Sequence, residues 1–250
     1  MDWSFQLYSA RDFQPWASVF DMLARLGYTQ VEGYGDLYLD AAAKRAELDR
    51  AGLSMPSGHF ALELLEDDFP AAHRTAKTLG MGMIACPYLE AAGRPADAAG
   101  WRDFGLRLGS IGKAAADAGL GFAWHNHEFE FEALADGSMP LTHILDAAPA
   151  IGWEIDVAWV IRGGADPLEW IDSYGERIVA AHVKDIAPQG EALHEDGWAD
   201  VGHGTVEWSG LMGALRGKTP AKIFVMEHDN PADLERFARR SIDTAKTFEA

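Results

Sequence analysis

Cysteine is almost absent from this sequence, since Cys86 is the one cysteine among 250 residues. A single thiol excludes an intrachain disulfide and a zinc site built from several cysteines. Cys86 ends the apolar run Met83-Ile84-Ala85, so we expect it to be a small buried core residue. The sequence also lacks a run of about 18 apolar residues, which a membrane span requires, and a basic segment followed by an apolar stretch at its start. We therefore expect a cytoplasmic protein.

Positive charge is scarce as well. Lys and Arg number 21 against 39 Asp and Glu, which gives a formal net charge of −18. Nucleic acid and acidic membrane surfaces would be repelled over most of such a molecule, so neither is an expected partner. No Gly/Ser-rich linker or low-complexity stretch interrupts the chain. With 48% hydrophobic and 24% charged residues, the composition is typical of a globular domain.

Short apolar runs rich in β-formers alternate with longer stretches of helical periodicity. This alternation predicts a parallel sheet with crossover helices. The predicted strands are residues 3–8, 30–33, 53–60, 83–88, 120–127, 151–157, 178–184 and 222–227, and the clearest helices are residues 16–26, 41–51, 69–79, 101–118, 141–147 and 234–248. Eight strands in a chain of this length predict a single-domain (β/α)8 TIM barrel over residues 1–250. A doubly wound open sheet is the alternative, but no glycine-rich phosphate loop follows the first strand.

Glycine marks the ends of several predicted helices. The pairs Leu26-Gly27, Ala51-Gly52, Leu79-Gly80 and Ala118-Gly119 each place glycine where a helix ends in a left-handed residue. Asp166 precedes Pro167, as an N-cap precedes a first-turn proline. These signals support the predicted order of strands and helices.

Reactive residues of such a barrel lie at the C-terminal ends of its strands. From the fifth strand onward these ends carry four residues that can bind metal: Glu130, Asp156, His182 and Glu227. Three carboxylates and an imidazole form a hard site that suits Mn²⁺, and Mg²⁺ or Co²⁺ as alternatives. Four protein ligands leave two positions of a six-coordinate ion for substrate oxygens.

Each of these residues also has an ordinary structural interpretation. Glu130 can be a loop carboxylate, His182 a hydrogen-bonded strand residue and Asp156 a helix cap. Asp156 and Glu227, however, follow apolar runs, where an ionised carboxylate needs a partner charge or a metal. Their occurrence at separate strand ends favours a shared cation.

Five stretches, in order along the chain, resemble the strand-end motifs of the sugar phosphate isomerase/epimerase family, the xylose isomerase-like (β/α)8 barrels. They are residues 125–131 (HNHEFEF), 156–160 (DVAWV) with 163–167 (GGADP), 182–185 (HVKD), 201–204 (VGHG) and 225–229 (VMEHD). The resemblance implies a divalent metal, often Mn²⁺, held by Glu, Asp, His and Glu, here Glu130, Asp156, His182 and Glu227. It also implies a small sugar as substrate.

The sequence departs from the family pattern at two positions. Relatives that epimerise free ketoses place a substrate-contacting histidine where Trp159 stands, so the resemblance implies a keto-glycoside or related cyclic keto sugar. His203 stands where the family often has glutamate, and both residues are expected to contact substrate. Trp124 and His59 are the further substrate-binding candidates, although tryptophan is also a common packing residue.

The chemistry expected of this site is a proton transfer through an enediolate. A metal would polarise the substrate carbonyl while a base removes the proton from the adjacent carbon. His127 is the favoured base and His125 a substrate contact, although the reverse assignment and a purely structural histidine network both stay open. Lys184 can stabilise the enolate or pair with a neighbouring carboxylate. Whether the protein forms a homo-oligomer is also open.

Other activities compete with isomerisation or epimerisation. A lyase or dehydratase would use the same enediolate to expel a β-substituent, including the aglycone of a keto-glycoside. A DNA-repair endonuclease would need more metal ligands and a basic groove, which the charge of −18 opposes. A barrel that serves only as a scaffold or accessory subunit would bind no metal.

Overall fold

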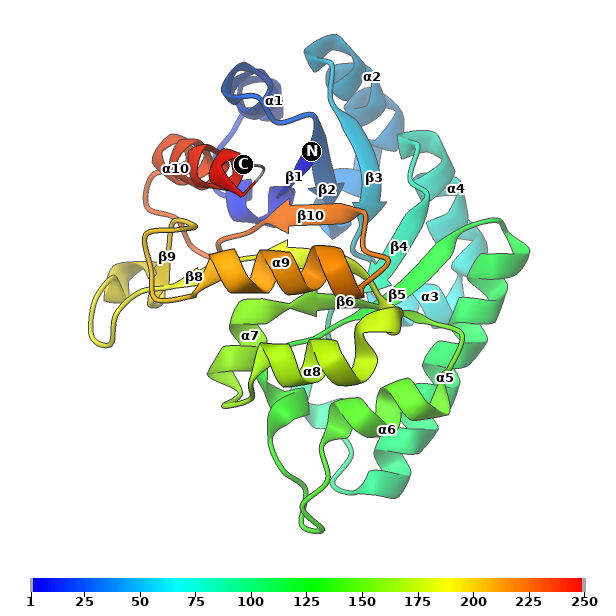
Figure 1. Cartoon of the computed structure of the whole chain (residues 1–250). Coiled ribbons are helices and arrows are strands. Elements are labelled where there is room, and N and C mark those ends of the chain that lie inside the picture. The colour runs from blue at the N-terminus through cyan, green and yellow to red at the C-terminus, as the bar shows by residue number, and fades with distance from the viewer. Residues whose placement is uncertain (1, 249–250) are drawn as a thin grey trace.

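Eight short parallel strands form a barrel in the computed structural model, which describes residues 2–248 (Figure 1). Each strand begins near one of the predicted positions. The strands are β1 (Trp3–Gln6), β2 (Gln30–Gly33), β3 (Ser54–Gly58), β4 (Met83–Cys86), β5 (Gly121–His125), β6 (Gly152–Asp156), β7 (Ile178–Val183) and β10 (Ile223–Met226). Except for β2, which has the predicted bounds, they are shorter than the sequence predicts.

The hydrogen-bonded order of the strands is β3-β2-β1-β10-β7-β6-β5-β4. At the seam between β3 and β4, His59 and Ala85 form a parallel bridge, and Phe60 N–H donates to the Ala85 carbonyl over 2.9 Å. The prediction of a (β/α)8 barrel is therefore confirmed. The eight strand ends face a common mouth, which is where side chains far apart in the sequence can meet.

Helices surround the barrel on its outer side (Figure 1). The longer ones are α1 (Trp16–Leu26), α2 (Ala41–Ala51), α4 (Phe69–Leu79), α5 (Ala98–Asp117), α6 (Pro140–Ala147), α8 (Pro167–Tyr174), α9 (Trp208–Lys218) and α10 (Leu234–Thr247). Short helices occupy the loops above the strand ends, among them α3 (Leu62–Asp67), α7 (Val157–Arg162) and the 3-10 helix η4 (Glu128–Phe131). No helix among residues 2–248 is long and apolar enough to cross a membrane.

The predicted helix ends agree with the backbone. Gly27 ends α1 with φ of 103° and Gly80 ends α4 with φ of 83°, a region that glycine enters without steric cost. Asp166 caps α8 by accepting the N–H of Leu168 over 2.8 Å. Cys86 is fully buried, as expected of a core residue.

One insertion escaped the sequence patterns. Between β7 and α9 the chain forms an antiparallel pair, β8 (Asp185–Ile186) with β9 (Trp198–Ala199). These strands have two residues each, too few for a periodic signal to predict. The pair covers one side of the barrel mouth, and Trp198 from β9 packs 4.8 Å from Trp159 on α7, centroid to centroid.

Candidate active site

The upper interior of the barrel is polar rather than apolar. Strand residues two positions apart point to the same side of a sheet, so Glu154 and Asp156 both face inward, as do His182 and Lys184. At most 9% of any such side chain is exposed, and the set consists of Gln6, Glu32, His59, His125, Glu154, Asp156, His182, Lys184 and Glu227. Barrel interiors are usually filled by branched apolar side chains. This concentration of buried polar groups therefore marks a functional site.

The first group of side chains lies at the mouth and consists of His125, Asp156, His182 and Glu227, hereafter the upper group. One potential ligand atom from each lies within 4.8 Å of those of the others. His182 Nδ1 lies 2.9 Å from Glu227 Oε2. Asp156 Oδ1 accepts the N–H of Trp159, whereas the buried Asp156 Oδ2 has no hydrogen-bond partner among the described residues. A buried carboxylate oxygen without a hydrogen-bond partner is available as a metal ligand.

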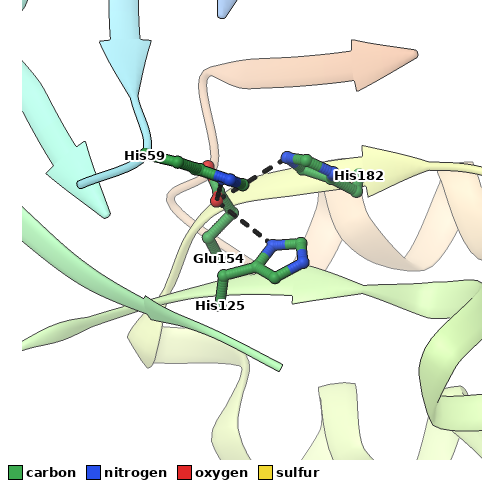
Figure 2. A group of neighbouring side chains, drawn as sticks. All are labelled: His59, His125, Glu154 and His182. Atoms are coloured by element: carbon green, nitrogen blue, oxygen red, sulfur yellow. Dashed lines mark hydrogen bonds and ion pairs between the residues drawn. The ribbon is translucent and has the colours of Figure 1, made fainter. Parts of the chain in front are cut away.

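A second group lies directly beside the first and consists of His59, His125, Glu154 and His182, hereafter the lower group (Figure 2). Three imidazoles converge on one oxygen, Glu154 Oε2. It lies 2.7 Å from His59 Nε2, 3.2 Å from His125 Nδ1 and 3.6 Å from His182 Nε2. His125 and His182 belong to both groups, so the lower group can orient the imidazoles of the upper one.

Glu32 completes the support of His182 from β2. Its Oε1 lies 2.7 Å from His182 Nε2 and accepts a hydrogen bond from Gln6 Nε2 over 2.9 Å. A carboxylate that takes the N–H of one imidazole nitrogen leaves the other nitrogen free to act as a ligand. Glu32 thereby directs His182 Nδ1 toward Glu227 and the upper group.

Burial and neighbouring charges shift the pKa values of the side chains in the lower group. Burial disfavours the charged imidazole of His59, but the carboxylates of Glu32 and Glu154 outweigh it and raise the pKa of His59 to about 10. Burial likewise acts to raise the pKa of Glu154, yet His59 and His182 lower it overall. Burial, followed by the neighbouring imidazoles of His182 and His59, lowers the pKa of His125 well below its usual value. His125 is thus neutral, the form that binds a metal.

The upper group is held together by Lys184. Its Nζ lies 2.6 Å from Asp229 Oδ1, 3.4 Å from Glu227 Oε2 and 3.9 Å from Asp156 Oδ2. Burial opposes its charge, but these carboxylates raise the pKa of Lys184 overall, so it stays protonated. Burial raises the pKa of Asp156. A cation near Asp156 Oδ2 would favour the ionised form of this carboxylate.

The donor set of the upper group fits a divalent ion. Two imidazoles and two carboxylates, without a thiolate, suit Mn²⁺, Co²⁺ or Zn²⁺, and the imidazoles make the set less suited to Mg²⁺ than the set with three carboxylates that the sequence predicts. Asp156 Oδ2, which has no hydrogen-bond partner among the described residues, and the neutral His125 would supply two of the required donor atoms. An ion held by these four residues could keep further coordination positions for substrate oxygens.

Glu130, predicted as a metal ligand, lies outside both groups. It belongs to η4, five residues past the end of β5, and is fully buried. Its Oε1 accepts the indole N–H of Trp124 over 2.8 Å and its Oε2 the backbone N–H of His127 over 2.9 Å. Both oxygens therefore serve the turn after β5, and His125 stands in the upper group in its place.

Two predicted substrate contacts also lie elsewhere. Trp124 precedes His125 on β5 and so points to the opposite side of the strand, where its ring packs 5.2 Å from Phe104 on α5. It is fully buried in the layer between the barrel and its helices. His203 is exposed on the loop after β9 and does not line the cavity above the strand ends.

That cavity has a volume of about 1010 Å³, and His59, His125, His127 and Glu227 are among its lining residues. The ring of His127 lies 5.2 Å from that of Trp159 and 5.0 Å from that of Tyr88. Its side chain and that of Glu130 form a reciprocal capping box at the start of η4. Burial, then the neighbouring His125, lowers the pKa of His127 well below its usual value, so the ring is neutral.

Sequence reasoning overlooked Glu154 as a member of the site. The signal that could have found it is its spacing of two from Asp156 on one strand, which places both on the inner face. The cavity wall also contains tyrosines that the sequence did not single out: Tyr8, Tyr34 and Tyr88. They follow β1, β2 and β4.

The sequence matches a family profile over residues 20–248, that of the xylose isomerase-like TIM barrel. No curated protein matches it. Among solved structures, a sugar phosphate isomerase/epimerase from Parabacteroides distasonis superposes with a TM-score of 0.81 at 19% identity, over 97% of this chain and 92% of the other. Similar structures also include the probable 3-DHS dehydratase AsbF from Bacillus anthracis (TM-score 0.77, 12% identity, 98% and 99% covered). Another is the IOLI protein with a bound zinc atom, which superposes with a TM-score of 0.77 at 15% identity, over 100% of this chain and 96% of the other.

Proposed function

This chain belongs to the xylose isomerase-like TIM barrel family, and from that premise we propose that it is a divalent-metal-dependent sugar isomerase or epimerase. One observation carries the proposal: ligand atoms of His125, Asp156, His182 and Glu227 lie within 4.8 Å of one another, and His125 and Glu227 line the cavity. A keto sugar or keto-glycoside is the proposed substrate. The cytoplasm is its proposed location.

We propose that the upper group holds the ion, with His125 in the position that the sequence prediction gave to Glu130. Mn²⁺ is the proposed metal, and the zinc reported for the IOLI protein makes Zn²⁺ the first alternative. Once bound, a divalent ion acts as a Lewis acid that polarises the substrate carbonyl and stabilises developing negative charge on its oxygen.

His127 is the proposed general acid and base. It lines the cavity beside the upper group without belonging to it, and its ring is neutral. It can take the proton from the carbon next to the carbonyl and return it to the neighbouring carbon or to the other face. Lys184 keeps its positive charge beside Asp156 and Glu227, where it favours an anionic substrate oxygen.

Trp159 is proposed to shield from water one side of the substrate carbon that loses its proton. Its ring lies next to His127 and 4.9 Å from Lys184 Nζ, centroid to nitrogen. A large aromatic face in this place excludes water from the proton transfer and can pack against a sugar ring. His59 reaches the same cavity, but its ion pairs with Glu32 and Glu154 favour a positioning role.

A lyase is the second candidate, because a dehydratase is among the similar structures. Loss of a proton next to a carbonyl creates the same anion in both reactions, and a leaving group on the β-carbon diverts it to elimination. Product mass separates the two: isomerisation conserves the mass of the substrate, whereas elimination releases water or an aglycone.

The proposal is tested with natively purified protein and a panel of keto sugars and keto-glycosides in deuterated buffer. Elemental analysis should find about one divalent ion per chain, as a mononuclear Lewis-acid site requires. Turnover should stop in chelator, return with Mn²⁺ or Co²⁺, and place one solvent deuteron on a substrate carbon. Turnover that survives complete metal removal without deuterium exchange would exclude the mechanism.

A further inference from the structure

We infer that this cavity takes an uncharged saccharide and discriminates against sugar phosphates. The inference rests on the proposed function and specifies its substrate class. It differs from what the name of the Parabacteroides distasonis relative suggests, a sugar phosphate isomerase/epimerase. Three features of the described residues support it: the net charge of the side chains that line the cavity, the contacts of the two lining arginines, and the loops after the last two barrel strands.

The lining of the cavity is strongly acidic. Its arginines are Arg11 and Arg107, and against them stand the carboxylates of Glu63, Glu66, Glu90, Asp196, Glu227 and Asp229. A divalent ion in the upper group would be balanced by Asp156 and Glu227. Arg107 pairs with Glu66 and Lys184 with Asp229, so the lining carboxylates without an ion pair among the described residues are Glu63, Glu90 and Asp196. A phosphate dianion that enters the cavity would be repelled by the carboxylates that line it.

Both arginines already have partners within the chain. Arg107 forms a bidentate pair with Glu66, Nε to Oε1 and Nη2 to Oε2, each over 2.8 Å. Arg11 donates from Nη1 to the carbonyl of Tyr8 over 3.0 Å and to that of Asp229, and its guanidinium lies 4.1 Å from the Tyr8 ring centroid. Bidentate pairing is the geometry in which arginine also binds phosphate. Glu66 therefore occupies the position on Arg107 that a phosphate would need.

The loops after the last two strands are where (β/α)8 barrels frequently bind phosphate through backbone amides. After β7, Asp185 fills such a site itself, since its carboxylate accepts the N–H groups of Ile186 and Gly202 over 2.8 Å each and that of Val206 over 3.0 Å. After β10, Glu195 Oε1 accepts the N–H of Ala232 over 2.6 Å. These amides lie outside the cavity lining, and carboxylates of the chain already accept their hydrogen bonds, so they offer no phosphate contact to a ligand in the cavity.

The remaining wall suits a sugar ring. Tyr8 and Tyr88 are 40% and 39% exposed, and they follow strands three positions apart around the barrel. Aromatic faces pack against the apolar faces of pyranoses, and carboxylates accept hydrogen bonds from their hydroxyls. The volume of about 1010 Å³ lies at the upper end of ligand pockets, about 300–1,000 Å³, so the cavity has room for a second ring or an aglycone.

The test measures binding by calorimetry on the Mn²⁺-loaded protein. The probes are the neutral disaccharides maltose and cellobiose, glucose 6-phosphate and inorganic phosphate. At least one neutral disaccharide should bind about tenfold or more tightly than glucose 6-phosphate, and the ratio should shrink at high salt, which screens repulsion. Equal or tighter binding of glucose 6-phosphate, or binding of neither disaccharide, overturns the inference.

Two variants sharpen the test. Asp185→Gly vacates the amides after β7, so inorganic phosphate should bind about tenfold more tightly than to the unaltered protein. Because Asp185→Gly can loosen its loop, Glu66→Gln offers a second measurement. This variant frees Arg107 from its ion pair, so the ratio of the affinities for the neutral disaccharide and for glucose 6-phosphate should fall. Glu169→Gln is the matched control, since it removes one exposed carboxylate on α8, outside the cavity lining. An effect of Glu169→Gln as large as that of Glu66→Gln overturns the assignment to the lining.

The readout separates this inference from the proposed function. Binding heat does not depend on turnover, so a protein that prefers neutral saccharides yet exchanges no deuterium contradicts the isomerase proposal alone. Conversely, metal-dependent isomerisation of a keto sugar and of its phosphate ester with equal kcat/KM contradicts the substrate inference alone.

Discussion

The upper and lower groups of the barrel contain the same two imidazoles but have different partners. At the mouth, His125 and His182 meet Asp156 and Glu227, and Asp156 has an oxygen without a hydrogen-bond partner among residues 2–248. In the lower group, the same imidazoles meet Glu154 Oε2, which already lies 2.7 Å from His59. The comparison teaches that a buried carboxylate can serve as a ligand or as a support, depending on whether a neighbouring imidazole already neutralises it.

Removing a ligand from the upper group should have the largest effect. In Glu227→Gln the neutral amide no longer offers a charged oxygen beside His182 and Lys184. We expect the protein to lose its metal during purification and its turnover to fall by at least about 10²–10³-fold, the loss that follows removal of one electrostatic stabiliser. Elemental analysis and initial rates measure the two effects. Full metal content in this variant would contradict the assignment of the upper group.

Replacing the proposed base should separate chemistry from metal binding. His127→Asn removes the neutral imidazole from the cavity wall but leaves the four side chains of the upper group in place. We expect turnover to fall about 10²–10⁴-fold, the usual contribution of a general acid or base, with the metal retained. Solvent deuterium exchange should fall in parallel. If exchange continues at the original rate, the proton is carried by another group.

A change in the support of His182 should have an intermediate effect. Glu32→Gln preserves size but replaces the carboxylate 2.7 Å from His182 Nε2, so the imidazole is less firmly oriented. We expect metal affinity to fall about 10–100-fold, as for other carboxylates that hold a metal-binding histidine. Titration with a competing chelator measures it. An affinity loss as complete as that of Glu227→Gln would mean that the lower group itself binds the ion.

The alternation of strands and helices predicted the barrel because eight apolar runs and their glycine-ended helices carry local signals. The site was harder to predict, since its ligand set depends on where each strand stops. Residues 120–127 were predicted as strand, but β5 ends at His125, and the following turn carries Glu130 away from the mouth. The hydrogen bonds from Trp124 and His127 that hold Glu130 depend on that turn, which periodicity does not describe.

Glu130 therefore provides the smallest and most selective test, in which stability changes but metal content does not. Burial raises the pKa of Glu130 to about 8, above its value in the unfolded chain, so the folded state binds a proton more readily. The stability from this group is complete below about pH 4.3 and is lost as pH rises through about 8. Glu130→Gln cannot ionise, so urea denaturation should show a flatter decline of the unfolding free energy over this range.

The same variant should be about 1–2 kcal/mol less stable near pH 5, because the amide NH₂ opposes one of the two N–H donors that the carboxyl group now satisfies. Its metal content should equal that of the unaltered protein. Loss of metal from Glu130→Gln under conditions in which the variant remains folded would restore Glu130 as a ligand and remove His125 from the upper group.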